Sequence, residues 1–423
     1  MNTETLDQPI VADVAVSAPA VVIESATPAV AAVAEGPNPF IALGLDGALV
    51  RAVSDLGYTQ PTEVQAKVIP LAMGSGKADE ASIDLMVSSQ TGSGKTAAFL
   101  LPVLNTLIAQ KAIEAAAEQA EFERQRAQAA ASGEAAPKRA KRKNPMQSRN
   151  FKAAVPGAWV LCPARELAQQ GAQDAIELVK HCKNLRVANV VGGMPYQLQI
   201  AKLQNADLVV ATPGRLLDLQ RSLQIKLDKV QFLVVDEADR MLDLGFADDL
   251  EEVHQMTAQR KQTMMFSATF APRIQQLAMR VMHDGGANVQ KITIATPQQG
   301  HDNIQQKLYW ADHAQHKRKL LDHWLRDTTI NQAIVFASTQ VECDGLAQDL
   351  AEAGFSAAAL HGALSQGLRN RRLRALREGQ IQILVATDVA ARGIDVPTIT
   401  HVFNYGLPMK AEDYTHRIGR TGR

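Results

Sequence analysis

The sequence predicts an α/β protein built from two doubly wound parallel sheets that are joined by a short linker. From about residue 158 onwards, short apolar runs alternate with helical patterns, which is typical of strands separated by crossover helices. A polar segment, residues 295–303, interrupts this alternation, and a second alternating set follows it. Two sets of similar style with a linker between them predict two lobes, residues 38–294 and 304–423.

The individual elements follow from the spacing of apolar residues. Order is expected to begin near Phe40, where the apolar positions Ile41, Leu45, Leu49, Val53 and Leu56 fit one face of a helix. Continuous apolar runs predict buried parallel strands. In the first lobe these are residues 83–88, 159–162, 187–191, 208–212, 230–236 and 263–267. In the second lobe they are residues 333–337, 357–360, 381–387 and 399–404.

Two segments are expected to stand outside the lobes. Residues 1–37 are biased towards Ala, Val and Pro without helical or strand periodicity, which predicts a disordered tail. Residues 109–150 interrupt the first lobe, and their Ala-rich first half could extend the helix predicted over residues 97–108. The basic run 137–143 is expected to be a mobile loop, which either contacts phosphates or only keeps the insertion soluble.

Composition sets limits on the environment and partners of the chain. Among 423 residues, Lys+Arg and Asp+Glu both count 44, so net charge does not indicate a polyanionic partner. Cys162, Cys182 and Cys343 are widely spaced and form no metal or disulfide pattern, which fits a reducing compartment. The acidic N-terminus is not typical of a secretory signal, and charges and prolines interrupt the apolar stretch after it. We expect a soluble, cytoplasmic monomer without a membrane partner.

A candidate phosphate-binding loop lies between the strand at 83–88 and the helix that follows. Its residues are Ser89, Gln90, Thr91, Gly92, Ser93, Gly94, Lys95 and Thr96. Small residues let backbone N–H groups surround phosphate oxygens, and the helix N-terminus adds positive potential. Lys95 is expected to reach the β- and γ-phosphates and Thr96 to bind Mg²⁺. The general pattern has Gly where Ser89 stands, but the rest of the loop and its context predict nucleotide binding.

The predicted strand 230–236 runs directly into an acidic cluster formed by Asp236, Glu237 and Asp239. Ligands of open α/β sheets bind beyond the carboxyl ends of strands. Clustered carboxylates repel each other unless a cation lies among them, although an acidic turn at a helix N-terminus would show the same pattern. The phosphate-binding loop favours the first interpretation. Asp236 then becomes a Mg²⁺ residue together with Thr96, largely through water, and Glu237 the group that activates the attacking water.

Asp236-Glu237-Ala238-Asp239 spells the signature of the DEAD-box RNA helicases, and further segments resemble that family's motifs in the same order. In the first lobe these are residues 57–65 with the upstream Phe40, 163–168, 192–193, 212–215 and 267–269. In the second lobe they are residues 335–338, 361–362 with Gln366 and Arg369, 386–395 and 416–423. One departure is Ala164, where the family usually has Thr. The resemblance spans about residues 40–423 and implies two RecA-like lobes of a bacterial type of superfamily 2 helicase.

The resemblance also implies roles around bound ATP. Gln65 is expected to read the adenine, with Phe40 and Tyr58 either lining that pocket or packing in the core. Arg420 and Arg423 are expected to share one face of a helix and to act as arginine fingers on the γ-phosphate. Asp395 is expected near the ribose. The residues expected to couple ATP hydrolysis to RNA-dependent closure are Asp239, Ser267, Thr269 and His416.

The RNA candidates implied by the resemblance combine small residues with Arg side chains that suit phosphates. They are Arg165, Gly193, Thr212, Arg215, Gly362, Gln366, Thr387 and Arg392. Such contacts carry no base information, so RNA binding is expected to be independent of sequence. The chain is only 4% aromatic and shows no stacking platform, which agrees with this expectation.

The function implied is an ATP-dependent RNA helicase. It would hydrolyse ATP to ADP and phosphate, unwind short RNA duplexes and remodel ribonucleoproteins in ribosome assembly or RNA turnover. The alternatives are a non-catalytic ATP-dependent RNA clamp and a DNA-acting helicase of the same superfamily. Because the family continues beyond the motif that ends at Arg423, we expect an incomplete second lobe that folds less well than the first.

Overall fold

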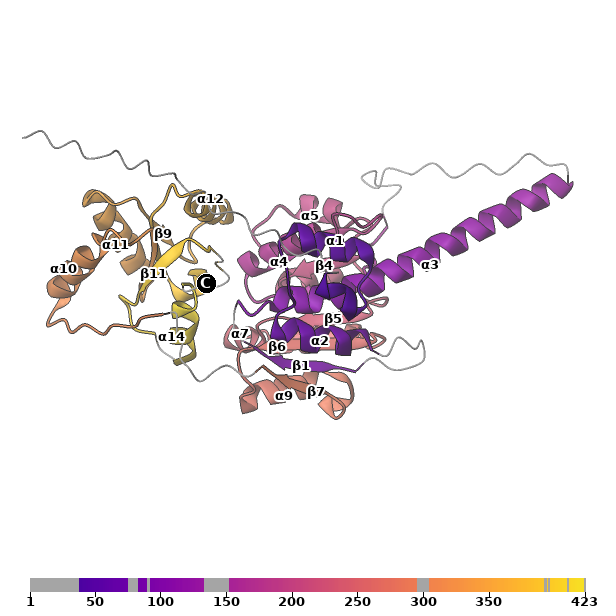
Figure 1. Ribbon diagram of the computed structural model, residues 1–423, viewed down its shortest axis with the longest axis horizontal. Helices are drawn as coiled ribbons and strands as arrows, with labels where there is room; N and C mark the ends of the chain where they lie inside the picture. Colours follow the sequence, from indigo (N-terminus) through magenta and orange to yellow (C-terminus); the bar gives the residue numbers. More distant parts are fainter. Residues whose placement is uncertain are drawn as a thin grey trace, which may run out of the picture. The chain divides into compact units, whose positions relative to one another are not determined.

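The computed structural model describes residues 38–74, 83–89, 92–132, 152–294, 304–391, 394, 396–408 and 411–421. The predicted tail, the basic run 137–143 and the predicted linker lie outside these residues. The prediction of two parallel-sheet α/β lobes is confirmed (Figure 1).

The first lobe contains a seven-stranded parallel sheet with the order β3-β4-β2-β5-β6-β1-β7. Its strands are β1 (Leu85–Ser88), β2 (Ala158–Leu161), β3 (Val187–Val190), β4 (Leu208–Ala211), β5 (Phe232–Val235), β6 (Gln262–Ser267) and β7 (Gln290–Thr293). Six lie where apolar runs predicted them. The sequence prediction missed β7, because this edge strand buries only Ile292 and carries no apolar run.

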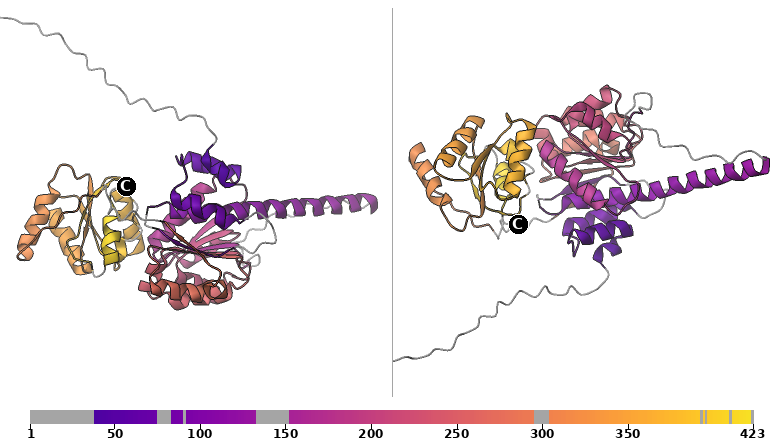
Figure 2. Two further views of the ribbon diagram at one scale, coloured as in Figure 1. Left: turned by 60° about the horizontal axis from the view of Figure 1, so that its bottom comes forward. Right: turned by 90° about the horizontal axis from the view of Figure 1, so that it is seen from above.

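Helices cover both faces of this sheet, and each face has its own core (Figure 2). The helices are α1 (Gly47–Asp55), α2 (Glu63–Met73), α3 (Lys95–Ser132), α4 (Arg165–Leu178), α5 (Tyr196–Leu203), α6 (Pro213–Arg221), α7 (Ala238–Asp243), α8 (Ala247–Met256) and α9 (Pro272–Val281), with short 3₁₀ helices η1 (Pro39–Leu43) and η3 (His283–Gly286). Helices α1 to α4 pack on one face with Val160 and Val234, and α6 to α9 pack on the other with Trp159 and Leu233. The alternation of side chains along β2 and β5 therefore fills both cores.

The single helix expected from Ile41 to Leu56 is wrong. Asn38 caps η1, which ends at Gly44 in a left-handed conformation with φ 77°, and Asp46 then caps α1 as a separate helix. Ile41 and Leu56 are consequently 53% and 38% exposed. The two capping side chains and the glycine override the apolar periodicity.

Helix α3 continues far beyond the lobe core (Figures 1 and 2). It ends at Ser132, so the Ala-rich first half of the insertion does extend the predicted helix. Its buried residues lie almost entirely between Lys95 and Leu107. Among the described residues it is the one helix long and apolar enough to cross a membrane, by length and composition. Half of its most apolar window is buried inside the protein, as in the core helices of soluble α/β domains.

The second lobe contains a four-stranded parallel sheet with the order β11-β8-β10-β9. Its strands are β8 (Gln332–Phe336), β9 (Ala357–Leu360), β10 (Ile383–Ala386) and β11 (Ile399–Phe403), all where the sequence predicted them. Its helices are α10 (Ala314–Leu325), α11 (Gln340–Glu352), α12 (Gln366–Arg377), α13 (Asp388–Ala391) and α14 (Ala411–Ile418). Two apolar clusters fill the opposite faces of the sheet.

Candidate active site

The candidate phosphate-binding loop connects β1 to α3, as predicted. Ser89 is buried after β1, and Lys95 begins α3 with only 8% of its surface exposed. Gly92 and Gly94 have φ of +84° and +88°, a left-handed conformation that glycine adopts without strain. Thr96 lies in the first turn of α3. Gln90 and Thr91 lie outside the described residues, and Ser93 lies between the two glycines.

Gln65 braces this loop from α2. Its Nε2 donates to the carbonyl of Gly94 at 3.1 Å, and its Oε1 accepts the backbone N–H of Thr62 at 3.0 Å. Thr62 in turn caps α2, so the two residues form a capping box. A Cβ on Gly94 would lie 2.6 Å from Gln65 Nε2. The buried Gln65 is therefore not an ordinary surface glutamine, and its predicted adenine contact stays a prediction.

Phe40 and Tyr58, the two candidate adenine-pocket aromatics, have different surroundings. Phe40 is fully buried and belongs to the same apolar cluster as Leu49 and Val53. The packing role that the sequence left open is the one seen here. Tyr58 is 40% exposed, and burial together with the nearby Asp174 raises its pKa. Tyr58 is thus the more accessible of the two to a ligand.

The acidic cluster lies at the carboxyl end of β5, as predicted. The Lys95 Nζ is 3.9 Å from Asp236 Oδ1, and the same oxygen accepts the backbone N–H of Glu237 at 3.0 Å. Glu237 has φ 50° and ψ 56°, a left-handed conformation that is uncommon for a residue with a side chain. Asp236, Glu237 and Asp239 are all buried. Backbone strain at a buried acid is a frequent property of functional sites.

The electrostatics of the cluster differ between its first two acids. Burial raises the pKa of Asp236 to about 6, against the attraction of Lys95 and with repulsion from Glu237 adding to the rise. Burial also acts to raise the pKa of Glu237, but attraction by Lys95, then Arg420 and Arg240, outweighs it and the net pKa is lowered. Lys95, Arg240 and Arg420 therefore oppose the negative charge of the acidic cluster, and a bound cation would oppose it further. Within the described ranges, no three His, Cys, Asp or Glu side chains cluster with metal-binding geometry.

Ser267 and Thr269, two of the predicted coupling residues, contact this cluster from the end of β6. The Ser267 hydroxyl donates to Asp239 Oδ1 at 3.3 Å and accepts the backbone N–H of Thr269 at 3.4 Å. The Ser88 hydroxyl at the end of β1 donates to the carbonyl of Ala268 at 3.1 Å. The segment therefore ties the acidic cluster to the strand that leads into the phosphate-binding loop.

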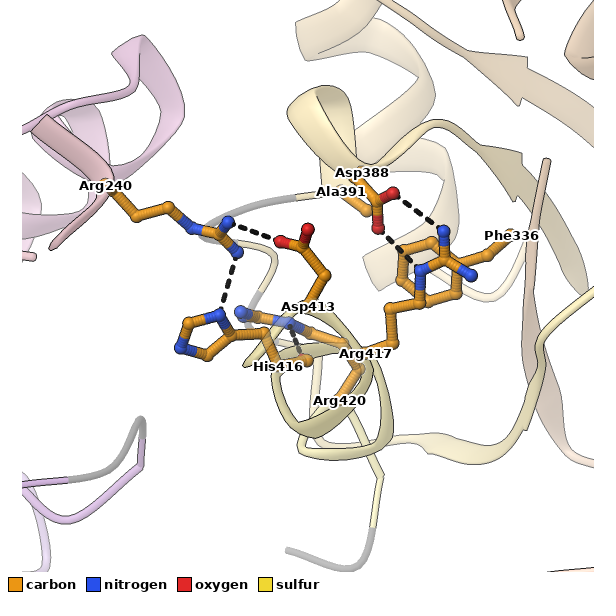
Figure 3. Close-up of a pocket in the computed structure, with 8 residues that line it drawn as sticks. All are labelled: Arg240, Phe336, Asp388, Ala391, Asp413, His416, Arg417 and Arg420. Carbon is orange, nitrogen blue, oxygen red and sulfur yellow. Dashed lines mark hydrogen bonds and ion pairs between the residues drawn. The ribbon is translucent and has the colours of Figure 1, made fainter. Parts of the chain in front are cut away.

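The second lobe contributes His416 and Arg420 to this region (Figure 3). Helix α14 ends at Ile418, so Arg420 lies in the turn after it. The prediction that Arg420 shares a helical face with Arg423 is therefore wrong for Arg420. Its Nε donates to the carbonyl of His416 at 3.2 Å and its Nη1 to that of Ile394 at 3.0 Å. Arg423 and Asp395 lie outside the part of the chain that the structure describes.

Sequence reasoning did not assign roles to several buried charged residues here. Arg240 of α7 donates to Asp413 at 2.7 Å, and Arg417 donates to Asp388 at 2.6 Å with its guanidinium 4.7 Å from the centre of the Phe336 ring. These residues line a small cavity with His416 and Arg420. Only their places in the sequence could have drawn attention to Arg240 and Arg417. Arg240 directly follows the acidic cluster, and Arg417 directly follows His416.

Three of the RNA candidates converge in one place. Arg165 Nη1 donates to Gln366 Oε1 at 3.4 Å, and a Cβ on Gly193 would lie 2.7 Å from Arg165 Nη1. Beside them is a buried ion pair that the sequence did not predict, Arg369 Nη2 to Glu166 Oε1 at 2.8 Å. Gln366 Nε2 donates to the same Glu166 oxygen at 3.2 Å. Arg165 and Glu166 begin α4 and Gln366 and Arg369 belong to α12, so this group joins the two lobes.

The remaining RNA candidates lie at strand ends or on helices. Thr212 precedes α6, and Arg215 within α6 donates to the carbonyl of Met194 at 3.3 Å. Gly362 follows β9 and Thr387 follows β10, and the Thr387 N–H donates to the carbonyl of Leu360 at 3.2 Å. No contact joins them to the Arg165 group among the interactions of the described residues. Arg392 is one of the residues that the structure does not describe.

Comparisons with known proteins agree with this arrangement. Residues 62–277 match the DEAD/DEAH box helicase family, and residues 315–423 match the helicase conserved C-terminal domain. The ATP-dependent RNA helicase SrmB of Escherichia coli K12 is 38% identical over 386 residues, which cover 91% of this chain and 76% of SrmB. The ATP-dependent RNA helicase DeaD of Mycobacterium tuberculosis H37Rv is 37% identical over 386 residues, which cover 90% of this chain but only 58% of DeaD.

A solved structure is similar across both lobes. The structure of S. cerevisiae Dbp5 bound to RNA and ADP BeF3 has a TM-score of 0.72 and 30% sequence identity, and the match covers 92% of this chain and 87% of that one. The resemblance inferred from the motifs is therefore confirmed. With one family match over half of its length and close similarity to SrmB over most of both proteins, this chain belongs to the DEAD-box ATP-dependent RNA helicases.

Proposed function

We propose that the chain is an RNA-stimulated ATPase that uses ATP binding and hydrolysis to separate short RNA duplexes locally. The observation that carries the proposal is that Lys95, Asp236 and Glu237 of the first lobe lie together. Arg420 of the second lobe acts on the same place, since it lowers the pKa of Glu237. An acid that is kept ionised beside a phosphate-binding lysine suits the activation of water. An arginine from the opposite lobe suits the stabilisation of charge in the transition state.

The residues present fit a magnesium ion. Asp236 is a buried carboxylate at the end of β5 beside the phosphate-binding Lys95, and carboxylate and hydroxyl oxygens are ligands that suit Mg²⁺. We propose that Asp236 and the Thr96 hydroxyl hold Mg²⁺, largely through water and together with the phosphates. When bound, the ion would neutralise charge on the β- and γ-phosphates.

Within the protein itself, each group has a defined task. Glu237 has a left-handed backbone at the N-cap of α7, directly after β5, and its carboxylate would orient and deprotonate the attacking water. Lys95 would bind the phosphates of ATP. Gln65 holds the carbonyl of Gly94 and would read the adenine edge with its remaining hydrogen-bonding capacity.

RNA binding is proposed to be independent of sequence and to use the phosphate backbone. Arg165, Gln366 and Gly193 provide a cation, an amide and a glycine backbone in one place, and these groups suit contacts with a phosphate. Because ATP and RNA would each contact both lobes, each would favour the same closed arrangement and strengthen the binding of the other. Asp239, Ser267, Thr269 and His416 would connect the two sites.

The cellular setting belongs to the proposal as well. We propose that the protein acts in the cytoplasm, in ribosome assembly or RNA turnover. The widely spaced free cysteines support a reducing compartment, since Cys162 and Cys343 are buried thiols rather than parts of a disulfide framework.

Steady-state ATP hydrolysis with and without RNA tests the proposal. We expect RNA to raise kcat, and a short RNA duplex to be separated faster than a DNA duplex of the same length and sequence. RNA binding that depends on ATP without any stimulation of turnover would favour a non-catalytic clamp. Equal separation of RNA and DNA duplexes would favour a DNA-acting helicase. Neither result would be compatible with the proposed function.

A further inference from the structure

Arg240 is a first-lobe arginine whose two hydrogen-bonded side-chain partners both belong to the second lobe (Figure 3). Its Nη1 donates to Asp413 Oδ1 at 2.7 Å, and its Nη2 lies 3.0 Å from His416 Nδ1. The side chains of Arg240 and Asp413 are only 5% and 14% exposed. One guanidinium thus holds two neighbouring positions of α14.

This ion pair stabilises contact between the lobes rather than the fold of either lobe. A buried ion pair gives little net stability, because removing both charges from water costs about as much as their attraction returns. If the lobes separated, Arg240 and Asp413 would lose each other. The pair therefore favours one arrangement of the two lobes, and loss of Arg240 would remove this partner from the buried carboxylate of Asp413.

The contact with His416 also selects a protonation state. An arginine has only donors, so His416 Nδ1 must accept, and the neutral ring then carries its proton on Nε2. Burial and the neighbouring Arg240 lower the pKa of His416, with Arg420 acting in the same direction. Glu237 and Asp239 face the ring from the first lobe and act to raise its pKa, and Asp413 lies one turn earlier on α14.

We propose that Arg240 is a positioning residue that, through Asp413 and His416, aligns Arg420 with Glu237 when the two lobes meet. Arg420 is tied to this arrangement because its Nε donates to the carbonyl of His416. The inference rests on the proposed RNA-stimulated ATPase and assigns a residue to its closure step.

The test uses R240M, D413N and the double variant in the full chain. With saturating RNA, we expect each single variant to lower kcat at least about tenfold and to change KM for ATP less than about threefold. ATP hydrolysis without RNA should change little. The double variant should be no more than about threefold worse than R240M, because the two side chains act as a pair. The proposal would be overturned if the loss of kcat in the double variant equalled the product of the two single losses, or if only KM changed.

Two further measurements separate positioning from general damage. R240K can donate to Asp413 or His416 but lacks the fork that reaches both, so it should recover only part of the loss. In R240M, His416 should gain a proton more readily, so the ratio of variant to wild-type kcat should be lower at pH 6 than at pH 8. A ratio independent of pH, together with full recovery in R240K, would contradict the two-partner role.

The matched control is R273M. Arg273 donates to Asp243 of α7 at 2.8 Å, so this pair ends on the same helix as Arg240 but stays within the first lobe. R273M should match the wild type, and an equal loss in R273M would overturn the proposal. If R240M unfolds at the assay temperature, D413N on the less buried side decides.

RNA affinity in the presence of a non-hydrolysable ATP analogue distinguishes failure of the inference from failure of the proposed function. If the wild type shows no RNA-stimulated turnover, the proposed function fails. R240M and D413N should still weaken analogue-dependent RNA binding about tenfold. Unchanged binding in both variants would overturn the role of Arg240 in either case.

Discussion

The two lobes share two buried ion pairs that resemble each other in geometry and differ in surroundings. Arg240 and Asp413 approach to 2.7 Å, and Arg369 and Glu166 to 2.8 Å, with similarly low exposure. The first pair lies beside His416 and influences Glu237, whereas the second lies beside Arg165 and Gln366. Because their distances and exposure are similar, the two ion pairs are expected to have similar interaction energies. We expect these neighbours to make the first pair sensitive to nucleotide and the second pair sensitive to RNA.

This difference indicates how binding at one site can reach the other. Each ligand would stabilise its own ion pair, and both pairs require the same relation between the lobes. Coupling of this kind is reciprocal, so ATP should strengthen RNA binding by the same factor as RNA strengthens ATP binding. A variant that breaks one of the two ion pairs should still show a measurable response to the ligand next to the other pair.

The largest effect is expected for K95A, which removes the nucleotide side altogether. Lys95 is the buried cation 3.9 Å from Asp236, so its loss removes the proposed phosphate contact and a cation that attracts both Asp236 and Glu237. We expect RNA-stimulated kcat/KM for ATP to fall on the order of 1000-fold. Binding of RNA without nucleotide should remain within about twofold of the wild type. Retention of ATP affinity in a titration would contradict the role of Lys95.

The next largest effect is expected for E237Q, which should stop turnover without breaking either ion pair. Glutamine keeps the size of Glu237 but cannot accept a proton from water, so kcat should fall about 100-fold or more. ATP and RNA should then remain bound together. Slow dissociation of labelled RNA from the ATP-loaded variant measures this state. Turnover at the wild-type rate would remove Glu237 as the base.

A smaller effect is expected for E166Q, which breaks only the RNA side. Arg369 would keep a hydrogen-bond acceptor but lose its counter-charge, so RNA affinity with an ATP analogue should fall about tenfold. ATP hydrolysis without RNA should be unchanged. The control is D349N, which weakens the Arg318–Asp349 pair within the second lobe at a side chain that is 62% exposed. A comparable loss in D349N would show that the comparison does not hold.

The smallest effect is expected for D174N, which touches neither ion pair. Burial, with repulsion from Glu177, raises the pKa of Asp174 to about 6. Because this pKa is above the unfolded value of 3.8, the contribution of Asp174 to stability is fully present below that value and is lost as pH rises through about 6. Asparagine never ionises, so D174N should be more stable by about 1–2 kcal/mol at pH 8.

Urea unfolding at two pH values measures this last effect. The gain in D174N should be much smaller near pH 4, where Asp174 is neutral in the folded chain and only about half ionised in the unfolded chain. A gain that is the same at pH 4 and pH 8 would attribute the effect to packing of the amide rather than to ionisation.

Local patterns in the sequence predicted most of the fold. Ten of the eleven strands in the described residues lay where continuous apolar runs placed them, because a parallel strand that is buried on both faces needs such a run. The exception, β7, is an edge strand with mostly exposed side chains, so it has no apolar run. The helix near the start was wrong because Gly44 and two capping side chains divide it.

Local patterns also predicted the candidate site where one segment carries its own chemistry. The glycines and Lys95 after β1, and the acids after β5, each follow from a strand end and a short motif. Gln65 was predicted for the adenine, but its bond to Gly94 could be seen only once α2 and the loop were in place. Phe40 could be assigned to the core only once its neighbours in η1, α1 and α2 were known.

Contacts between distant residues depended on the folded chain. Arg240 and Asp413 are 173 residues apart, and Gln366 and Glu166 are 200 apart, so no window of sequence shows either pair. The positions of strands along the chain are encoded locally because they depend on burial and backbone preference. The pairing of two buried charges depends on how whole lobes pack. For that reason the amino acids alone identified the family and its motifs, while the proposed connection between the ATP and RNA sites rests on contacts of α7 with α14 and of α4 with α12.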